Sequence, residues 1–295
     1  MMLIGAQVPM AGGPLRALEY AVAAGCETMQ IFAKSPRRWM GPALDPATAE
    51  AFREACAAAS FGPVFSHTSY LINMGSEDDA LWDRSAEALA DELLRAGELG
   101  AAGAVVHLGR RFSDDDGESV ARVAACALRA QEIAGPSAAR LLLENSAGAG
   151  RQFGVTAAEM SAALAAVRAA GVDAALCIDT CHAFAGGIDV RSLEGWSTLL
   201  AELEAACGPG SVALIHANDC LGELGTHKDR HAWVGEGHIG IDGFGAMFHL
   251  PGLAGASVCV EMPGDGPFKD EENVRRLKAL RDDAVVRDAR GPGPA

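Results

Sequence analysis

Histidine and aspartate residues recur in the stretch 214–240, which reads LIHANDCLGELGTHKDRHAWVGEGHIG. An apolar run ends on His216, and a polar, glycine-bearing loop follows with Asp229 and His231. Imidazole and carboxylate groups together are a typical ligand set for zinc and related ions. On its own the stretch could equally be a solvated loop, so its meaning depends on the rest of the chain.

The same pattern, an apolar run that ends on an ionisable side chain, recurs in five other runs along the chain. A single histidine or glutamate at such a place is usually an ordinary hydrogen-bonded residue. Many imidazoles and carboxylates gathered in one place would repel one another or stay unpaired without cations between them. The candidate ligands are His67, His107, Glu144, Asp179, His182, His216, Asp229, His231 and Glu261.

These candidates are too many for one metal ion, because zinc takes three or four protein ligands plus water. We therefore expect two or three ions, with a carboxylate bridging a pair. A pair about 4 Å apart is the usual arrangement for phosphate ester chemistry. Cys181 lies between two of the candidates, and we interpret it as a packed thiol rather than a ligand.

The elements that must position these residues alternate along the chain. Continuous apolar strands separated by helices indicate a parallel sheet buried on both faces. Eight such units predict an α/β fold, a single (β/α)8 TIM barrel over residues 1–285 with the metal site at the C-terminal rim of the strands. We expect strands at 2–6, 28–33, 63–67, 104–107, 140–145, 174–180, 212–218 and 257–262, and helices at 14–25, 46–59, 79–99, 117–134, 156–170, 190–207, 241–248 and 270–281.

The alternative is an open, doubly wound sheet. That fold usually carries a glycine-rich phosphate loop after its first strand, and GAQVPMAGG at 5–13 does not match that fingerprint. Residues 286–295, which end in GPGPA, are expected to form a disordered tail.

Three blocks resemble the signature regions of the endonuclease IV family: HTSYLINMG (67–75), LCIDTCHAFAGG (176–187), and IHAND with DRHAWVGEGHIG (215–240). The segments GAQVPMAGG, KSPRRW (34–39) and ENSAGAG (144–150) are also similar to that family. The likeness covers the chain from about Met2 to Leu280. Members of this family are zinc-dependent AP endonucleases of base excision repair, built on a TIM barrel.

The resemblance implies three zinc ions per chain, with Mn²⁺ able to replace zinc. Glu144 would bridge two ions; Glu144 and Glu261 would also be the catalytic carboxylates. Arg37 and Tyr70 would contact DNA near the lesion. The implied ligands are His67 and His107 for the first ion, Asp179, His216 and Glu261 for the second, and His182, Asp229 and His231 for the third.

The function implied is cleavage of DNA 5′ to abasic sites, which leaves a 3′-OH and a 5′-deoxyribose phosphate, with 3′-end trimming as a further activity. An activated water would attack the phosphate. The expected partner is double-stranded DNA with abasic sites, and a monomer is expected.

Four positions depart from the pattern of the family. Gln7 stands where histidine is usual, Leu108 where proline is usual, and Cys220 and Leu221 where a small residue and lysine are usual. None of them is a candidate ligand, so they affect loop shape and DNA contact rather than the metal site.

The formal net charge of −15 argues against a nucleic-acid partner at face value. Bound cations and basic loop residues can still make the rim locally positive, and local potential governs docking. Some of these basic residues are expected only to solvate the rim. The basic residues expected in the loops of this rim are Lys34, Arg37, Arg38, Arg110, Arg111, Arg151, Lys228, Arg230 and Lys269.

The bulk features favour a cytoplasmic protein that does not enter a membrane. The eight cysteines are scattered, and the N-terminus lacks the pattern of a signal peptide. No run of about 18 apolar residues occurs.

Two rival functions remain open from the residues. A sugar isomerase or epimerase on a metal-bearing barrel usually has fewer ligands, and the separate pair at Asp229 and His231 argues against it. A protein that holds damaged DNA or stores metal without turnover is the other rival. An open two-metal site argues against that hypothesis.

Overall fold

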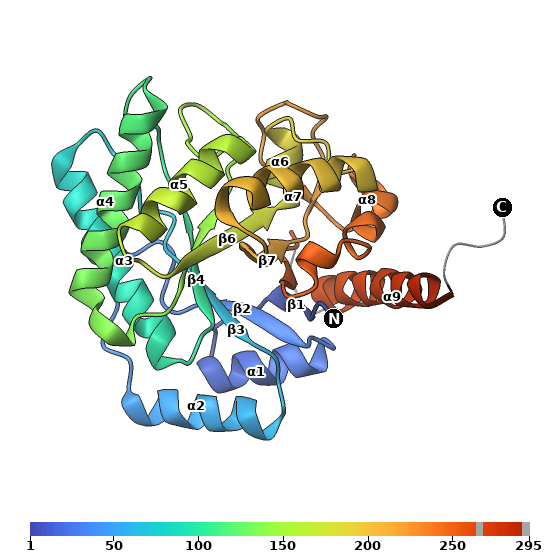
Figure 1. Ribbon diagram of the computed structural model, residues 1–295. Helices are drawn as coiled ribbons and strands as arrows, with labels where there is room; N and C mark the ends of the chain where they lie inside the picture. The colour runs from blue at the N-terminus through green and yellow to red at the C-terminus, as the bar shows by residue number, and fades with distance from the viewer. Residues whose placement is uncertain (264–267, 291–295) are drawn as a thin grey trace.

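Eight parallel strands close into a barrel in the computed structural model, which describes residues 1–263 and 268–290. The first strand pairs with both the second and the last, which completes the ring (Figure 1). The closed ring confirms the TIM barrel and shows that the open-sheet alternative is wrong. The barrel strands are β1 (Ile4–Gln7), β2 (Thr28–Phe32), β3 (Val64–His67), β4 (Gly103–His107), β5 (Leu141–Glu144), β6 (Ala174–Asp179), β7 (Val212–His216) and β10 (Ser257–Val260).

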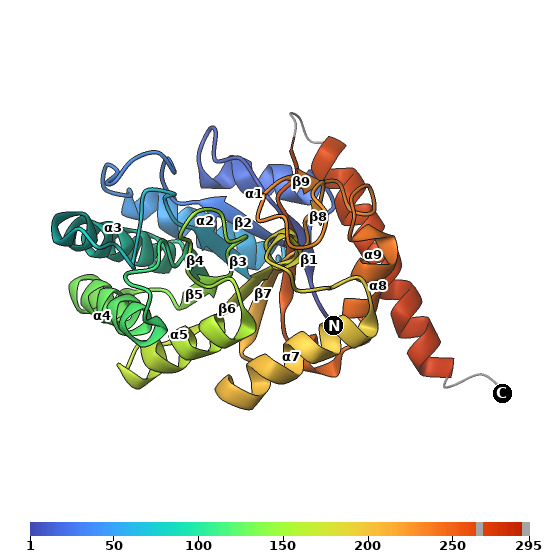
Figure 2. The ribbon, with the colours of Figure 1, turned by 90° about the horizontal axis from the view of Figure 1, so that it is seen from above.

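Helices cover the outside of this barrel (Figures 1 and 2). Within the described residues, no helix is both long enough and apolar enough to cross a lipid bilayer. The outer helices are α1 (Pro14–Ala23), α2 (Pro46–Ala58), α3 (Asp79–Glu98), α4 (Asp116–Ala134), α5 (Ala157–Ala169), α7 (Leu193–Cys207), α8 (Gly240–Met247) and α9 (Phe268–Arg290), with 3₁₀ turns η1 (Gly135–Ser137) and η2 (Pro251–Leu253).

Short polar side chains mark where several of these helices begin. Asp45, Asp78, Asp115, Thr156 and Ser192 each accept a hydrogen bond from a backbone N–H in the first turn of the helix that follows. These N–H groups have no partner inside the helix, so the caps satisfy them and fix the start of the helix.

Three short elements at the C-terminal rim were not predicted. The helix α6 (Thr180–Ala185) follows β6 directly (Figure 1). The strands β8 (Asp219–Cys220) and β9 (His231–Ala232) pair as a two-stranded antiparallel ribbon (Figure 2). At the C-terminus of the chain, α9 continues past residue 286, where the disordered tail was expected to start. Residues 291–295 lie outside the described part.

The apolar residues form two groups, one between the strands and the outer helices and a smaller one inside the barrel. The outer group includes Phe52, Leu93 and Trp196. Because side chains alternate along a strand, residues two apart share a face. The residues below the rim on the inner face are Phe65, Val105, Leu142, Ala175, Cys177, Leu214 and Cys259.

Candidate metal centre

The two-residue alternation of the strands directs the candidate ligands into the mouth of the barrel. On β3 the inner residue Phe65 is followed two positions later by His67, and on β5 Leu142 is followed by Glu144. A packed apolar layer therefore supports a polar layer directly above it. The same spacing places His107 above Val105, Asp179 above Cys177, His216 above Leu214 and Glu261 above Cys259.

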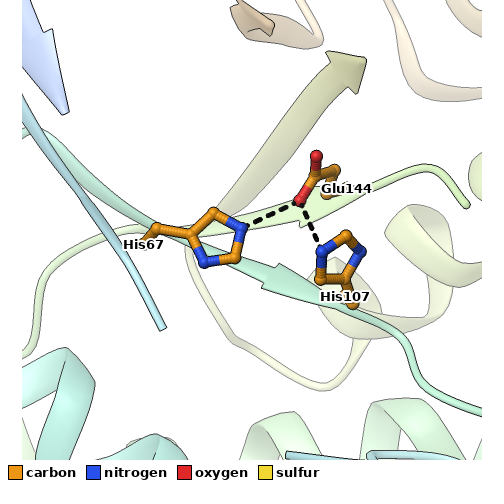
Figure 3. A group of neighbouring side chains, drawn as sticks. All are labelled: His67, His107 and Glu144. Atoms are coloured by element: carbon orange, nitrogen blue, oxygen red, sulfur yellow. Dashed lines mark hydrogen bonds and ion pairs between the residues drawn. The ribbon is translucent and has the colours of Figure 1, made fainter. Parts of the chain in front are cut away.

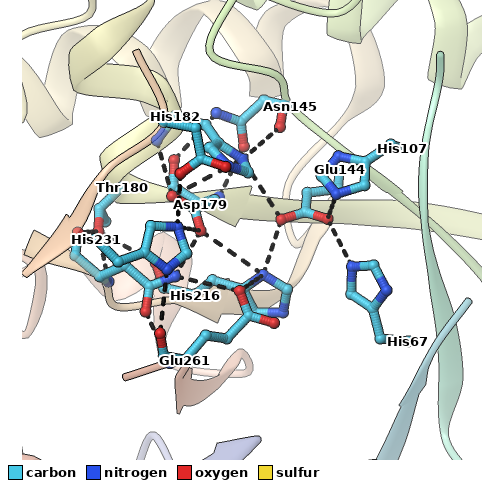
Figure 4. A network of polar contacts seen from close by, with 12 residues as sticks. His67, His107, Glu144, Asn145, Asp179, Thr180, His182, His216, His231 and Glu261 are labelled. Carbon is cyan, nitrogen blue, oxygen red and sulfur yellow. Dashed lines mark hydrogen bonds and ion pairs between the residues drawn. The ribbon is translucent and has the colours of Figure 1, made fainter. Parts of the chain in front are cut away.

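Glu144 lies at the centre of this layer and is fully buried. Its Oε2 atom lies 3.2 Å from Nε2 of His67 and 3.3 Å from Nε2 of His107 (Figure 3). Its Oε1 atom lies 2.9 Å from Nδ1 of His216, which comes from the opposite direction (Figure 4). The two oxygens of one carboxylate therefore face different groups of candidate ligands.

A second group shares Glu144 and adds Asp179, His216 and Glu261, with all four ligand atoms within 4.8 Å of one another. Nδ1 of His216 lies 3.5 Å from Oε2 of Glu261 and 3.9 Å from Oδ2 of Asp179. This group contains three carboxylates around one imidazole, a donor set that suits a divalent cation.

The third group consists of His182, Asp229 and His231. Asp229 lies between the two imidazoles, with Oδ2 at 3.3 Å from Nε2 of His182 and Oδ1 at 3.1 Å from Nε2 of His231. Two of the short rim elements that were not predicted position the histidines of this group: α6 carries His182, and β9 carries His231. Asp179 also caps α6, and its Oδ1 accepts the backbone N–H of His182 at 2.8 Å.

The outward nitrogen of most of these imidazoles is held by an acceptor behind the site. Nδ1 of His67 lies 2.8 Å from the carbonyl oxygen of Thr68, and Nδ1 of His182 lies 3.0 Å from that of Asn145. Nδ1 of His231 likewise lies 3.1 Å from the carbonyl oxygen of Glu261. This arrangement directs Nε2 toward the site, as is usual for metal-binding histidines. The donor set therefore fits bound metal ions.

The charges of the cluster are strongly coupled. Burial lowers the pKa of His107 to about 4, so this imidazole is neutral at physiological pH. Burial acts in the same direction on His182 and His231, but Asp179 and Asp229 outweigh it and raise their pKa values to about 10 and about 9. The carboxylates thus require positive charge beside them, which either protons or divalent ions can supply.

Two thiols also lie beside the candidate ligands. Cys177 is near Glu144 and His216, and Cys181 is near Asp179 and His231. Burial raises the pKa of the Cys177 thiol to about 12, which disfavours the thiolate that a metal needs. The histidine and carboxylate groups are therefore the better candidates.

Comparison with known proteins agrees with this geometry. Residues 18–282 match the family described as xylose isomerase-like TIM barrels. A protein of Methanoculleus marisnigri named "Probable endonuclease 4" is 39% identical, and the alignment covers 95% of this chain and 99% of that one. The crystal structure of endonuclease IV from Thermus thermophilus superposes with a TM-score of 0.84 at 37% identity, over 95% of this chain and 99% of that one.

The chain belongs to the endonuclease IV family. It is therefore an enzyme, as its motifs predict. A solved L-ribulose 3-epimerase also superposes, with a TM-score of 0.68 at 18% identity over 98% of this chain and 100% of that one. At that identity the likeness shows the fold alone.

Two buried amides in this endonuclease IV centre were missed in the sequence. Nδ2 of Asn218 donates to Oδ2 of Asp179 at 2.6 Å and to Oε2 of Glu261 at 3.3 Å. Nε2 of Gln30 donates to Oε1 of Glu261 at 2.9 Å, and its Oε1 atom lies 2.9 Å from Nε2 of His216. Both amides orient candidate ligands. The alternation along β2 could have revealed Gln30, because its register partner on β3 is the inward-facing Phe65.

Beside the candidate metal centre lies an open groove of about 910 Å³. Tyr70, His107, His182 and Asp229 line it, and Tyr70 is 62% exposed. The ring of Tyr70 lies 5.7 Å from that of His67, so the residue expected to contact DNA borders the candidate ligands. The arginines that also line the groove are Arg110, Arg111 and Arg151.

The expected basic rim needs a correction at Lys34. Its side chain is only 3% exposed, and its Nζ atom lies 2.7 Å from Glu92 and 3.0 Å from Asp91. Lys34 therefore does not offer its charge to a ligand at the surface. Arg37, in the same loop, is exposed, as are Arg38, Arg110, Arg151, Lys228 and Arg230, whereas Arg111 and Lys269 are partly buried and pair with carboxylates.

Proposed function

We propose that this protein is a zinc-dependent phosphodiesterase that cleaves duplex DNA 5′ to abasic sites and leaves a 3′-OH and a 5′-deoxyribose phosphate. The supporting observation is Glu144, whose two oxygens face separate groups of imidazoles in a buried layer beside an open groove. The relatives named endonuclease 4 support a nuclease activity. Trimming of damaged 3′ ends is a further activity that the same site would support.

We assign one zinc ion to each of the three ligand groups, with Mn²⁺ as an alternative metal. Such ions would lower the pKa of an attacking water and neutralise charge that develops on the phosphate. His67, His107 and Glu144 would hold the first ion, and His182, Asp229 and His231 the third. The second would be held by Glu144, Asp179, His216 and Glu261.

Within this site Glu261 would orient the attacking water. Its side chain is more exposed than that of Glu144, at 19% against 1%, so it faces the opening of the centre. Burial and the nearby Glu144 oppose its ionisation, but His216, with His67 and His231, outweighs them and lowers the pKa of the carboxyl. Glu261 is therefore ionised at neutral pH, and its Oε atoms can accept a proton or a hydrogen bond from water.

Recognition of the lesion would rest on the rim loops. An abasic duplex is easiest to kink and unstack at the missing base, and exposed side chains can fill that gap. Arg37 and Tyr70 are exposed in neighbouring loops beside the metal centre. We propose a monomeric enzyme that acts in the cytoplasm, where the eight free cysteines would remain reduced.

The test uses a labelled duplex with one abasic site and a matched intact duplex. The proposal predicts incision at the 5′ side of the lesion by the zinc-loaded protein, and loss of incision after prolonged chelation. Full activity after chelation would contradict metal dependence. Equal cleavage of both duplexes would contradict specificity for abasic sites.

A further inference from the structure

The two loops that carry Arg37 and Tyr70 contact each other through one carbonyl group. The oxygen of Pro36 accepts the backbone N–H of Tyr70 at 3.2 Å and the hydroxyl of Ser69 at 2.8 Å. The position of Tyr70 relative to Arg37 therefore depends on how the loop after β2 sits against the loop after β3.

A buried carboxylate on α3 lies beneath both loops. Oε1 of Glu92 accepts the backbone N–H of Ser69 at 2.9 Å and lies 2.7 Å from Nζ of Lys34. Glu92 is 1% exposed, and Lys34 also lies 3.0 Å from Asp91. One oxygen atom thus joins the loop of Arg37, through Lys34, to the loop of Tyr70, through Ser69.

Other residues on the same face of α3 contact later residues of the loop after β2, the loop that carries Arg37. Arg95 bonds Asp91 through Nε and donates from Nη2 to the carbonyl oxygen of Gly41 at 2.9 Å. The guanidinium of Arg84 lies 4.4 Å from the ring centroid of Trp39. Positions 84, 91 and 95 recur at helical spacing, so one face of α3 forms a base for the loop.

The ion pair between Glu92 and Lys34 is buried, with both side chains no more than 3% exposed. Burial raises the pKa of the Glu92 carboxyl, and Lys34 and the Ser69 N–H act against that rise. A buried pair contributes little net stability. Removal of the Glu92 charge would leave Lys34 paired with Asp91 alone, at 3.0 Å. The pair therefore favours one arrangement of the loops more than it stabilises the fold.

We propose that Glu92 is a positioning residue for lesion recognition, which sets the Tyr70 loop against the Arg37 loop through Ser69 and Lys34. This inference rests on the proposed function. It gives Lys34 a role in the protein interior rather than in contact with phosphate. Neither Glu92 nor Lys34 touches the metal-binding groups, so the chemistry of the centre should not depend on them directly.

The test compares Glu92→Gln with Glu27→Gln. Glutamine at position 92 can still accept the Ser69 N–H but removes the charge that faces Lys34. Glu27 is a matched control, because it accepts the backbone N–H of Ile4 at 3.0 Å and pairs with Arg281 at the opposite end of β2. The double variant Lys34→Met/Glu92→Gln removes both buried charges, which protects the fold if the single variant is unstable.

The readouts are KM and kcat for abasic duplex, kcat/KM for bis(p-nitrophenyl) phosphate, and hydrogen exchange at the amides of Ser69 and Tyr70. Glu92→Gln and the double variant should raise KM for the abasic duplex by about tenfold, since small displacements of binding groups are costly. Both should speed exchange at the two amides while hydrolysis of the small diester stays within about twofold of wild type. Glu27→Gln should change none of these values.

The inference is overturned if Glu92→Gln affects KM and exchange no more than Glu27→Gln does. It is also overturned if hydrolysis of the small diester falls as much as that of DNA, because Glu92 would then support the metal centre. Wild-type protein that binds abasic and intact duplexes equally would instead overturn the proposed function, and the positioning role with it.

Discussion

Oε1 of Glu144 lies 2.9 Å from Nδ1 of His216, while the other oxygen of the same carboxylate lies 3.2 Å from Nε2 of His67. The two histidines come from β7 and β3, which are not neighbours in the barrel. A single carboxylate therefore reaches two sides of the barrel mouth. This relationship supports the proposal that Glu144 would bridge a pair of ions.

Replacement of the two central glutamates should have different effects. Glu144→Gln should lose both metal and activity, because it weakens two ligand groups at once. Glu261→Gln should lower kcat by about 10²- to 10⁴-fold, the range for a positioned acid–base group, while the other ions can remain bound. Metal analysis and incision assays on both variants test this. Wild-type turnover and metal content in Glu144→Gln would refute the bridging role.

Asn218 should control the metal centre although it is not a candidate ligand. Its amide holds Asp179 and Glu261, so Asn218→Ala should reduce metal affinity or activity on the order of 10- to 100-fold. Asn273→Ala is a suitable control, since this buried amide bonds only backbone groups of Val234 and Lys269 in the described structure. Competition with a zinc chelator measures the affinity, and equal affinities for the two variants would count against the positioning role.

The exposed residues at the rim should affect DNA binding and leave the metals in place. Arg37→Ala and Tyr70→Ala should each weaken binding to abasic duplex by about 1–3 kcal/mol if base stacking is lost. Binding should also weaken steeply with salt, because phosphate contacts release counterions. Titrations against abasic and intact duplexes at two salt concentrations check both effects. Unchanged discrimination together with no salt dependence would show that this face does not bind DNA.

Metal binding should release protons at neutral pH. The pKa values of His182 and His231 are raised to about 10 and about 9. In protein stripped by chelation, both imidazoles therefore carry a second proton at pH 7 and are positively charged. An ion must displace these protons, so its apparent affinity should rise with pH and level off above the raised pKa values. Calorimetry of zinc binding in two buffers that differ in ionisation enthalpy measures the release. Identical enthalpies in both buffers would contradict the expected protonation.

Much of the fold and of the candidate site could be predicted because both follow from regular spacing. Eight apolar runs alternate with helical segments, and the ionisable residue at the end of a run falls at the strand rim. The alternation that places His67 above Phe65 applies equally to the other strands. This is why six candidates at strand ends come together in the structure.

The parts that were missed depend on contacts between distant segments or on very short elements. The ribbon that carries His231 has two residues in each strand, too few for a periodic signal. The helix α6 begins at Thr180, directly after Asp179, which is both the last residue of β6 and the cap of the helix. The burial of Lys34 results from its packing against Glu92 on α3, and nothing in the local sequence KSPRRW indicates that contact.

In the proposed enzyme, three groups of side chains each hold a zinc ion beside the groove that receives abasic DNA. Anomalous diffraction from crystals of the protein, collected above and below the zinc absorption edge, would locate these ions. We expect three zinc peaks per chain, one among His67, His107 and Glu144, one among Glu144, Asp179, His216 and Glu261, and one among His182, Asp229 and His231. A single peak, or peaks away from Glu144, would contradict the trinuclear centre and favour the simpler metal site of a sugar isomerase.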